Sequence, residues 1–203
     1  TVFGSSATYR VWQVRNVGGG SATLRVVNVT GDYVFGVQPD APQSGSSLLL
    51  DTGDNRMMQA AGIGNAISGV HGTLCNIGGD ASESCVRVVR ISVGQNGPSL
   101  TASISQQTTF GEASGVFYFW PGIAVNSVEE TAVAFHRSSG ASFLSSYWTV
   151  KALASTFETA SPITVGTCAQ TLSNRTGDYI GAQTDPSDSS TFWLAGERAT
   201  TIN

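Results

Sequence analysis

Residues 119–126 read FWPGIAVN, and residues 131–139 read TAVAFHRSS. Both runs are rich in β-branched and aromatic residues, and the polar stretch Ser127–Glu130 separates them, which predicts two strands joined by a turn. The small apolar segment Ile123–Asn126 suits a strand that is buried on both faces. Further along, Ser146–Ala152 predicts a third strand and Ser161–Val165 a short fourth. We therefore expect this region to form one four-stranded antiparallel sheet.

Short strand-like segments of the same character occur along the rest of the chain. Helical periodicity is nearly absent; its closest approach, Trp148–Phe157, is short, and Pro39–Ser47 reads as a loop rich in Pro, Gly and Ser. Many short strands bounded by turn residues predict an all-β chain, either a sandwich, a barrel or a propeller. The further predicted strands are Tyr9–Val17, Ala22–Thr30, Cys85–Val93, Leu100–Ser105, Tyr179–Thr184 and Thr191–Ala195.

Composition limits the class of protein. Hydrophobic residues make up 40% of the 203 residues, enough for one core, and we expect residues 1–203 to form a single unit with no second domain. Only 12% of residues are charged and the net charge is −4. No basic patch marks a nucleic-acid partner, and no run approaches the roughly 20 apolar residues of a membrane span. No signal peptide is seen, and a chain beginning at Thr1 suggests a processed product.

Three motifs resemble a known family. They are the FWPGIAVN stretch with the strand that ends in Arg137-Ser138, the GDYIGAQTDPSD stretch at 177–188 followed by Thr191-Phe-Trp193, and DTGDNR at 51–56. Together they resemble the C-terminal blades of large secreted bacterial β-propeller proteins, related loosely to sialidase-like propellers. The resemblance covers about Asp51 to Glu197. It implies four-stranded antiparallel blades and a secreted or extracellular location, and it says little about activity.

The strand count suggests that the propeller is incomplete. The chain holds about three blades' worth of strands, fewer than the typical four to eight of a closed propeller, and its first and last strand pairs are each half a blade. The similar segments Asn28–Tyr33 and Asn174–Tyr179 are consistent with repetition. We expect the missing blades to come from another part of the same precursor, from a second chain, or from a second copy in a homo-oligomer. A small closed β-sandwich is the alternative.

The three cysteines bear on the compartment. Cys75 and Cys85 flank a loop rich in Gly, Asp and Ser, which favours a disulfide suited to a secreted protein, with two reduced thiols as the alternative. Cys168 is either free or paired outside the chain. No zinc-site pattern follows His71. Asn28 and Asn174 are glycosylation candidates.

The residues do not assemble into a recognisable catalytic motif. A sialidase-like glycoside hydrolase needs an arginine cluster with a tyrosine and carboxylates, and the Asp-box repeat typical of that group is absent. His71 and His136 lie inside strand-like segments, which favours structural roles. A hydrolase fragment whose site is completed by missing blades is therefore the alternative function. Its candidate residues are Arg56, Arg90, Arg137, Tyr147 and Glu130.

Carboxylates and tryptophans near the C-terminus leave two further possibilities open. Asp178, Asp185 and Asp188 are weak calcium candidates, but Asp185-Pro186 more simply predicts a self-bonded turn. Trp120, Trp148 and Trp193 suit core packing, whereas exposed members would favour a glycan partner. With no cofactor implied, the sequence favours a non-catalytic extracellular module with a role in binding, adhesion or structural self-assembly.

Overall fold

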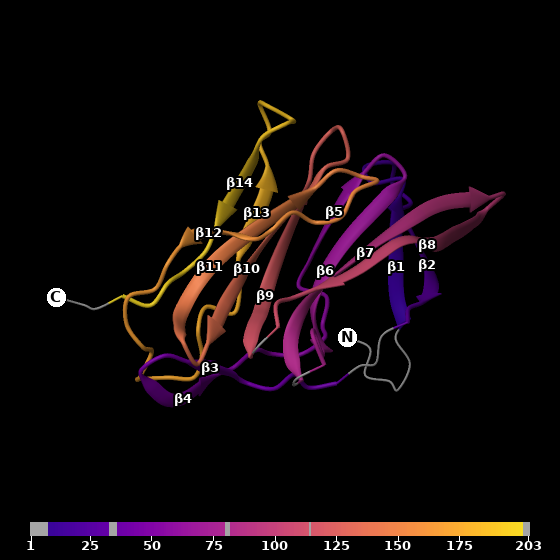
Figure 1. The fold of residues 1–203 in the computed structure, drawn as a ribbon. Coiled ribbons are helices and arrows are strands. Elements are labelled where there is room, and N and C mark those ends of the chain that lie inside the picture. Colours follow the sequence, from indigo (N-terminus) through magenta and orange to yellow (C-terminus); the bar gives the residue numbers. More distant parts are fainter. Residues whose placement is uncertain (1–7, 33–35, 80–81, 114, 201–203) are drawn as a thin grey trace.

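The computed structural model describes residues 8–32, 36–79, 82–113 and 115–200. Within these ranges the chain forms strands and no helix, which confirms the all-β prediction. The strands make two four-stranded antiparallel sheets and three two-stranded hairpins (Figure 1).

The first four-stranded sheet, the β5–β8 sheet, is a meander of neighbouring strands. It contains β5 (Gln59–Ile63), β6 (Ala66–Cys75), β7 (Glu83–Asn96) and β8 (Ser99–Phe110) in that order. Its two tight turns contain Gly64 and Gly97, both with positive φ, which glycine adopts without steric cost.

The second, the β9–β12 sheet, is the sheet predicted for residues 119–165. It contains β9 (Val116–Val125), β10 (Thr131–Ser139), β11 (Ser142–Lys151) and β12 (Ser161–Thr164). The prediction is confirmed, although β9 begins earlier than Ile123 and β11 earlier than Ser146. Every residue of β9 is buried, as expected of a strand covered on both faces.

Two hairpins lie at opposite ends of the molecule (Figure 1). The N-terminal hairpin joins β1 (Thr8–Arg15) to β2 (Thr23–Thr30), and the C-terminal hairpin joins β13 (Gly181–Thr184) to β14 (Phe192–Ala195). The strand pairs predicted at the two ends of the chain are thus present. Within one chain they form separate two-stranded sheets and do not pair with each other.

The prediction of a loop at Pro39–Ser47 is wrong. This segment contributes to a hairpin between β3 (Ala41–Gln43) and β4 (Ser46–Leu50), turning at Gly45 with φ 73°. The hairpin is held by the core rather than by β propensity, because Ala41 and Leu50 are fully buried.

The sheets stack as successive layers, and an apolar core lies on each side of the β5–β8 sheet. The N-terminal hairpin packs on the β5–β8 sheet, the β5–β8 sheet packs on the β9–β12 sheet, and the C-terminal hairpin packs on β9 and β10. Four-stranded antiparallel sheets are thus shown. Stacked layers of this kind occur both in propellers and in sandwiches, so the propeller itself stays a prediction.

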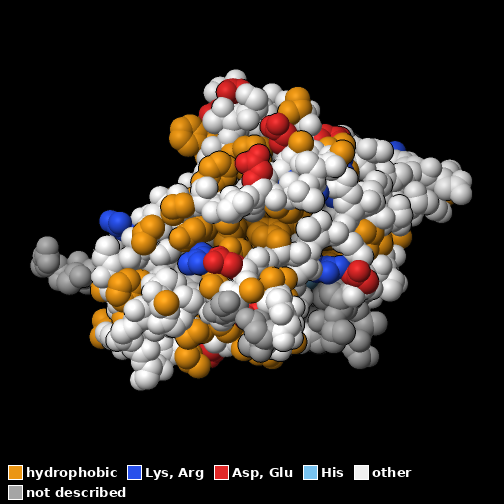
Figure 2. Space-filling view, in the orientation of Figure 1, with side chains coloured by type: hydrophobic (Ala, Val, Ile, Leu, Met, Phe, Trp, Pro, Cys, Tyr) orange, Lys and Arg blue, Asp and Glu red, His pale blue; other side chains and the backbone are white. Residues whose placement is uncertain are grey.

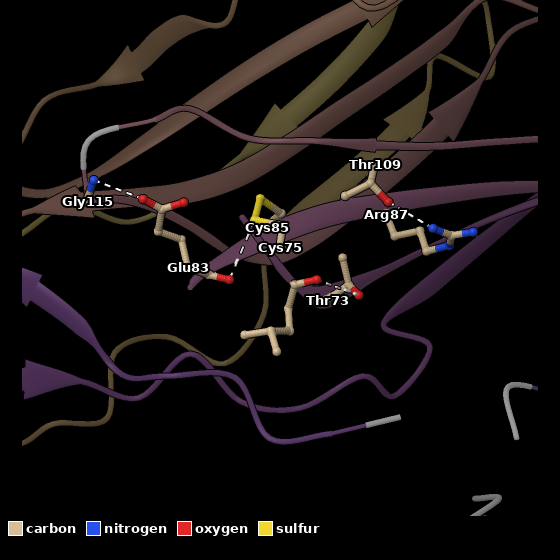
Figure 3. Close-up of a disulfide and its surroundings, with 8 residues drawn as sticks. Thr73, Cys75, Glu83, Cys85, Arg87, Thr109 and Gly115 are labelled. Atoms are coloured by element: carbon tan, nitrogen blue, oxygen red, sulfur yellow. Dashed lines mark hydrogen bonds between the residues drawn. A yellow bond between two sulfur atoms is a disulfide. The ribbon is translucent and has the colours of Figure 1, made fainter. Parts of the chain in front are cut away.

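The predicted disulfide between Cys75 and Cys85 is present and joins the end of β6 to the start of β7 (Figure 3). Its two Cα atoms lie 5.9 Å apart. Beside it, the buried Glu83 carboxylate accepts a hydrogen bond of 2.9 Å from the Gly115 backbone N–H. Cys168 is a free, half-buried thiol.

Candidate interaction surfaces

The first strands of three successive layers, β5, β9 and β13, lie side by side. The Gln59 amide of β5 donates to Ala182 O of β13 at 2.8 Å, and its Oε1 accepts from Ile123 N of β9 at 3.1 Å. Gly122 lies against Ile180, and the Thr184 hydroxyl bonds to Val125 O at 2.8 Å. β13 therefore runs in the same direction as β9, and occupies the first position of its layer.

A cavity of about 590 Å³ lies at these first strands, lined by Met58, Gln59, Pro121 and the C-terminal hairpin. Two exposed aromatic side chains border it, Tyr179 at 77% and Trp193 at 62% exposure. Trp120, by contrast, is buried and donates its indole N–H to Asp51 O at 2.9 Å. The prediction of core packing is confirmed for Trp120, whereas Trp148 is half-buried and Trp193 lies at the surface.

The N-terminal hairpin is apolar on both faces. Tyr9, Val11 and Val29 face the β5–β8 sheet and are buried. On the opposite face Trp12 lies across from Val26, and Val14 lies across from Leu24. These four side chains, the exposed stripe, are between 51% and 61% exposed. Strands with apolar residues on both faces are typical of layers that are covered on both sides.

The N-terminal hairpin covers only half of the sheet beneath it. Its inward side chains pack on Val89 and Ile91 of β7 and on Leu100 of β8, and Ile67 of β6 lies partly buried at the edge of this cluster. Among the described strands, β1 pairs with β2 alone, and no strand continues the layer from β1 over β5 and β6. A cavity of about 500 Å³ is found there instead, with Met57, Ala60, Ile67 and Gly69 among its lining residues.

The contacts of β1 define its position in the layer. Tyr9 bonds to His71 of β6 at 3.0 Å, and His71 pairs in register with Arg87 of the neighbouring β7. At the other end of β1, Arg15 donates to Gln95 on β7 at 3.3 Å. β1 therefore runs in the same direction as β7, the third strand of its sheet, and β2 lies near β8, the fourth.

The two hairpins carry opposite charges. The N-terminal hairpin, from Thr8 to Thr30, contains three arginines and no acidic residue, whereas Gly181–Ala195 contains Asp185 and Asp188 and no basic residue. Figure 2 shows acidic side chains among apolar ones at the top of the view, where the tip of the C-terminal hairpin lies. Hydrogen bonds, led by that from the Ser187 hydroxyl, lower the pKa of Asp185 to about 2, so this carboxylate stays charged in mild acid.

The three calcium candidates have local partners. Asp185 Oδ1 accepts from Ser187 N at 2.7 Å and from Asp188 N at 3.1 Å, and its Oδ2 accepts from the Trp193 indole N–H at 2.6 Å. Asp188 accepts from the backbone and hydroxyl of Ser190. Asp178 forms an ion pair with Arg175. This is the self-bonded turn that the sequence favours, and the described residues contain no group of three metal-ligating side chains.

The arginines of the hydrolase alternative each have a different carboxylate partner. Arg56 pairs with Asp54 at 2.8 Å, Arg90 with Glu129 at 3.1 Å and Arg137 with Glu112 at 2.9 Å. Glu130 accepts instead from the Asn126 amide at 2.6 Å. The three predicted arginines are thus distributed over separate ion pairs. Arg137 also contacts Tyr147, as a cation–π pair at 5.1 Å.

One constellation was not predicted. Tyr118 donates its hydroxyl to Glu112 at 3.0 Å, beside the Arg137 ion pair. Burial, followed by the charge of Glu112, raises the pKa of Tyr118, so its hydroxyl is held protonated rather than activated. The arrangement suits a structural bond over the aromatic core.

The two histidines are buried, and the asparagines of the two sequons are exposed. His71 and His136 lie in β6 and β10 and are fully buried, and desolvation lowers the pKa of both, that of His136 to about 4. Asn28 and Asn174 are exposed, and Asn28 accepts a hydrogen bond from Arg10 at 3.0 Å.

No protein-family model, curated protein or solved structure matches the chain. In the described ranges, no helix is long and apolar enough to cross a membrane.

Proposed function

We propose that the chain is a non-catalytic module of an extracellular β-propeller that binds another polypeptide through its two end hairpins. One observation carries this proposal: each end layer has two strands, whereas the sheet on which each packs has four. β1 and β14 each have one hydrogen-bonded neighbour among the described strands. Strand edges with unpaired N–H and C=O groups pair readily with an added strand.

The exposed stripe of Trp12, Val14, Leu24 and Val26 supports the same conclusion. An apolar surface of this kind on one small hairpin is typical of an interaction site. The Cys75–Cys85 disulfide is compatible with a secreted location, where such bonds persist. The separate ion pairs of Arg56, Arg90 and Arg137 support a binding role over the hydrolase alternative.

Strand addition can be tested with labelled synthetic peptides of alternating Val and Thr, in matched versions with acidic or basic ends. We expect the acidic peptide to bind saturably by fluorescence polarisation, because the N-terminal hairpin is cationic. Trp12→Glu should abolish this binding, whereas Val128→Glu on the exposed β9–β10 turn should leave it unchanged. Binding of the acidic peptide by Trp12→Glu as tight as its binding by Val128→Glu, or turnover of sialosides by the purified chain, would contradict the proposal.

Tyr179 and Trp193 favour a second candidate function, glycan binding at the cavity beside β13. Exposed aromatic rings with polar edges suit the apolar face of a sugar ring. Calorimetry with neutral oligosaccharides tests this, because Tyr179→Ala should remove any binding. Retention of binding in that variant would reject the site.

A further inference from the structure

We infer that the partner is a second copy of this chain, and that two copies complete each other's end layers to close a ring of six four-stranded sheets. The inference rests on the proposed polypeptide-binding function and names its partner. In each junction β14 of one copy pairs with β1 of the other, which gives the strand order β13, β14, β1, β2. A two-fold axis relates the two junctions.

The two hairpins fill complementary positions in a four-stranded layer. The C-terminal hairpin occupies the first two positions of a layer, since β13 lies beside and parallel to β9. The N-terminal hairpin occupies the last two, since β1 follows the direction of β7 and β2 lies near β8. A second strand and a third strand are antiparallel neighbours in both complete sheets, so β14 and β1 have the required directions.

The free faces of the two hairpins and of the β5–β8 sheet are complementary in shape. In the ring, the outer face of the C-terminal hairpin lies over β5 and β6 of the second copy, the half of that sheet that its own N-terminal hairpin leaves uncovered. The exposed Trp193 projects from this outer face, opposite Gln183. The cavity over β5 and β6, about 500 Å³, is large enough for an indole and contains apolar Met57, Ala60 and Ile67. The geometry places Trp193 of one copy in that cavity of the other.

The charges of the two hairpins are complementary as well. The N-terminal hairpin is cationic and the C-terminal hairpin is anionic, so a junction between unlike hairpins is attractive. Pairing two N-terminal hairpins would oppose arginines with arginines, and pairing two C-terminal hairpins would oppose Asp185 and Asp188 with their counterparts. Charge therefore favours the head-to-tail junction over both like pairings.

The count of layers fixes the stoichiometry. Apart from the β3–β4 hairpin, which packs on β9, β10 and β11 of its own copy, each copy supplies two complete sheets and two half sheets, so two copies supply four complete sheets and two shared ones. Six sheets lie within the range of four to eight blades over which propellers close. Closure leaves neither β1 nor β14 as an open edge.

Light scattering after size exclusion, in a Cys168→Ser background that removes the free thiol and leaves the Cys75–Cys85 disulfide intact, tests the inference. We expect a species of twice the 21.1 kDa chain mass at concentrations where Trp193→Glu and Val26→Glu are both monomeric. In the ring, the exposed stripe that contains Val26 lies over β11 and β12 of the other copy. Val26→Glu and Trp193→Glu therefore each bury a carboxylate in a junction, which should weaken the dimer by about 100-fold or more. Val128→Glu, with a comparably exposed side chain outside the junctions, should remain dimeric.

Mixing the two monomeric variants distinguishes head-to-tail from like pairing. Trp193→Glu retains an intact N-terminal hairpin and Val26→Glu retains an intact C-terminal hairpin, so the mixture contains one wild-type junction and should recover a dimer. A Trp193→Glu variant that stays dimeric, a mixture that stays monomeric, or a wild-type chain that is monomeric or forms longer polymers would overturn the inference. If the strand peptides bind while the wild-type chain stays monomeric, the partner is wrong and the proposed function stands.

Discussion

At the scale of single residues, the fold depends on a contact between two motifs that are distant in the sequence. Trp120 has a positive φ of 50° and its ring lies where a Cβ on Gly53 would be, 2.5 Å from the nearest ring atom. Gly53 itself has a φ of 75°. The DTGDNR and FWPGIAVN motifs were both identified from sequence, but their mutual contact follows only from the stacking of the layers.

Gly53→Ala is predicted to lower the free energy of unfolding by about 2–4 kcal/mol, because it combines backbone strain with overpacking against Trp120. Gly18→Ala is the matched control, since Gly18 has a φ of 88° and nothing within 4 Å of the added methyl group. Urea denaturation measures both. A Gly53 variant no less stable than the Gly18 variant would show that the ring does not fill this position.

The buried His136 makes stability depend on pH. Desolvation lowers its pKa to about 4 in the folded chain, below the value of 6.5 expected when unfolded. The unfolded state therefore takes up a proton first, and stability is lost as the pH falls from 6.5 to 4, by up to about 3 kcal/mol. His71 acts in the same direction. Chemical denaturation at several pH values in this range gives the free energy of unfolding as a function of pH. We expect this free energy to depend less steeply on pH in His136→Gln, and an unchanged dependence would exclude His136 as the cause.

At the scale of elements, a strand could be predicted from sequence where its residue pattern matches the burial of its two faces. The β9–β12 sheet follows from its β-branched runs and the polar turn between them. The β3–β4 hairpin was missed because Ala41-Pro42-Gln43 has no β propensity and is held by burial of Ala41 and Leu50. The faces of β1 were ambiguous for a physical reason, since Trp12 and Val14 are as apolar as the buried Tyr9 and Val11.

The disulfide should stabilise the β6–β7 pair because it reduces the conformational entropy of the unfolded chain. The Cys75→Ser, Cys85→Ser double variant is predicted to lose about 2–3 kcal/mol, the loop-closure entropy of a span of 10 residues. Cys168→Ser, which removes a free thiol, should change stability little. Thermal melting with and without reductant compares the three. Equal melting of the double variant and the parent would mean that the bond does not constrain this pair.

At the scale of the whole molecule, the strand count predicted half a propeller, and the two half-width hairpins are consistent with that count. The sequence could not show where the hairpins sit, because the position of a layer depends on contacts such as Arg15 with Gln95 and Thr184 with Val125. Nor could it show that Trp193 is exposed, since alternation alone does not say which face of a strand meets the core.

The most direct test of the account is hydrogen exchange by mass spectrometry, measured on dilute and concentrated chain. We predict that amides of β1 and β14 become protected as the concentration rises, while those of β6, β7 and β10, already paired on both sides, do not change. Protection that appears elsewhere while β1 and β14 exchange equally fast at both concentrations would contradict the claim that the end hairpins are the binding surfaces.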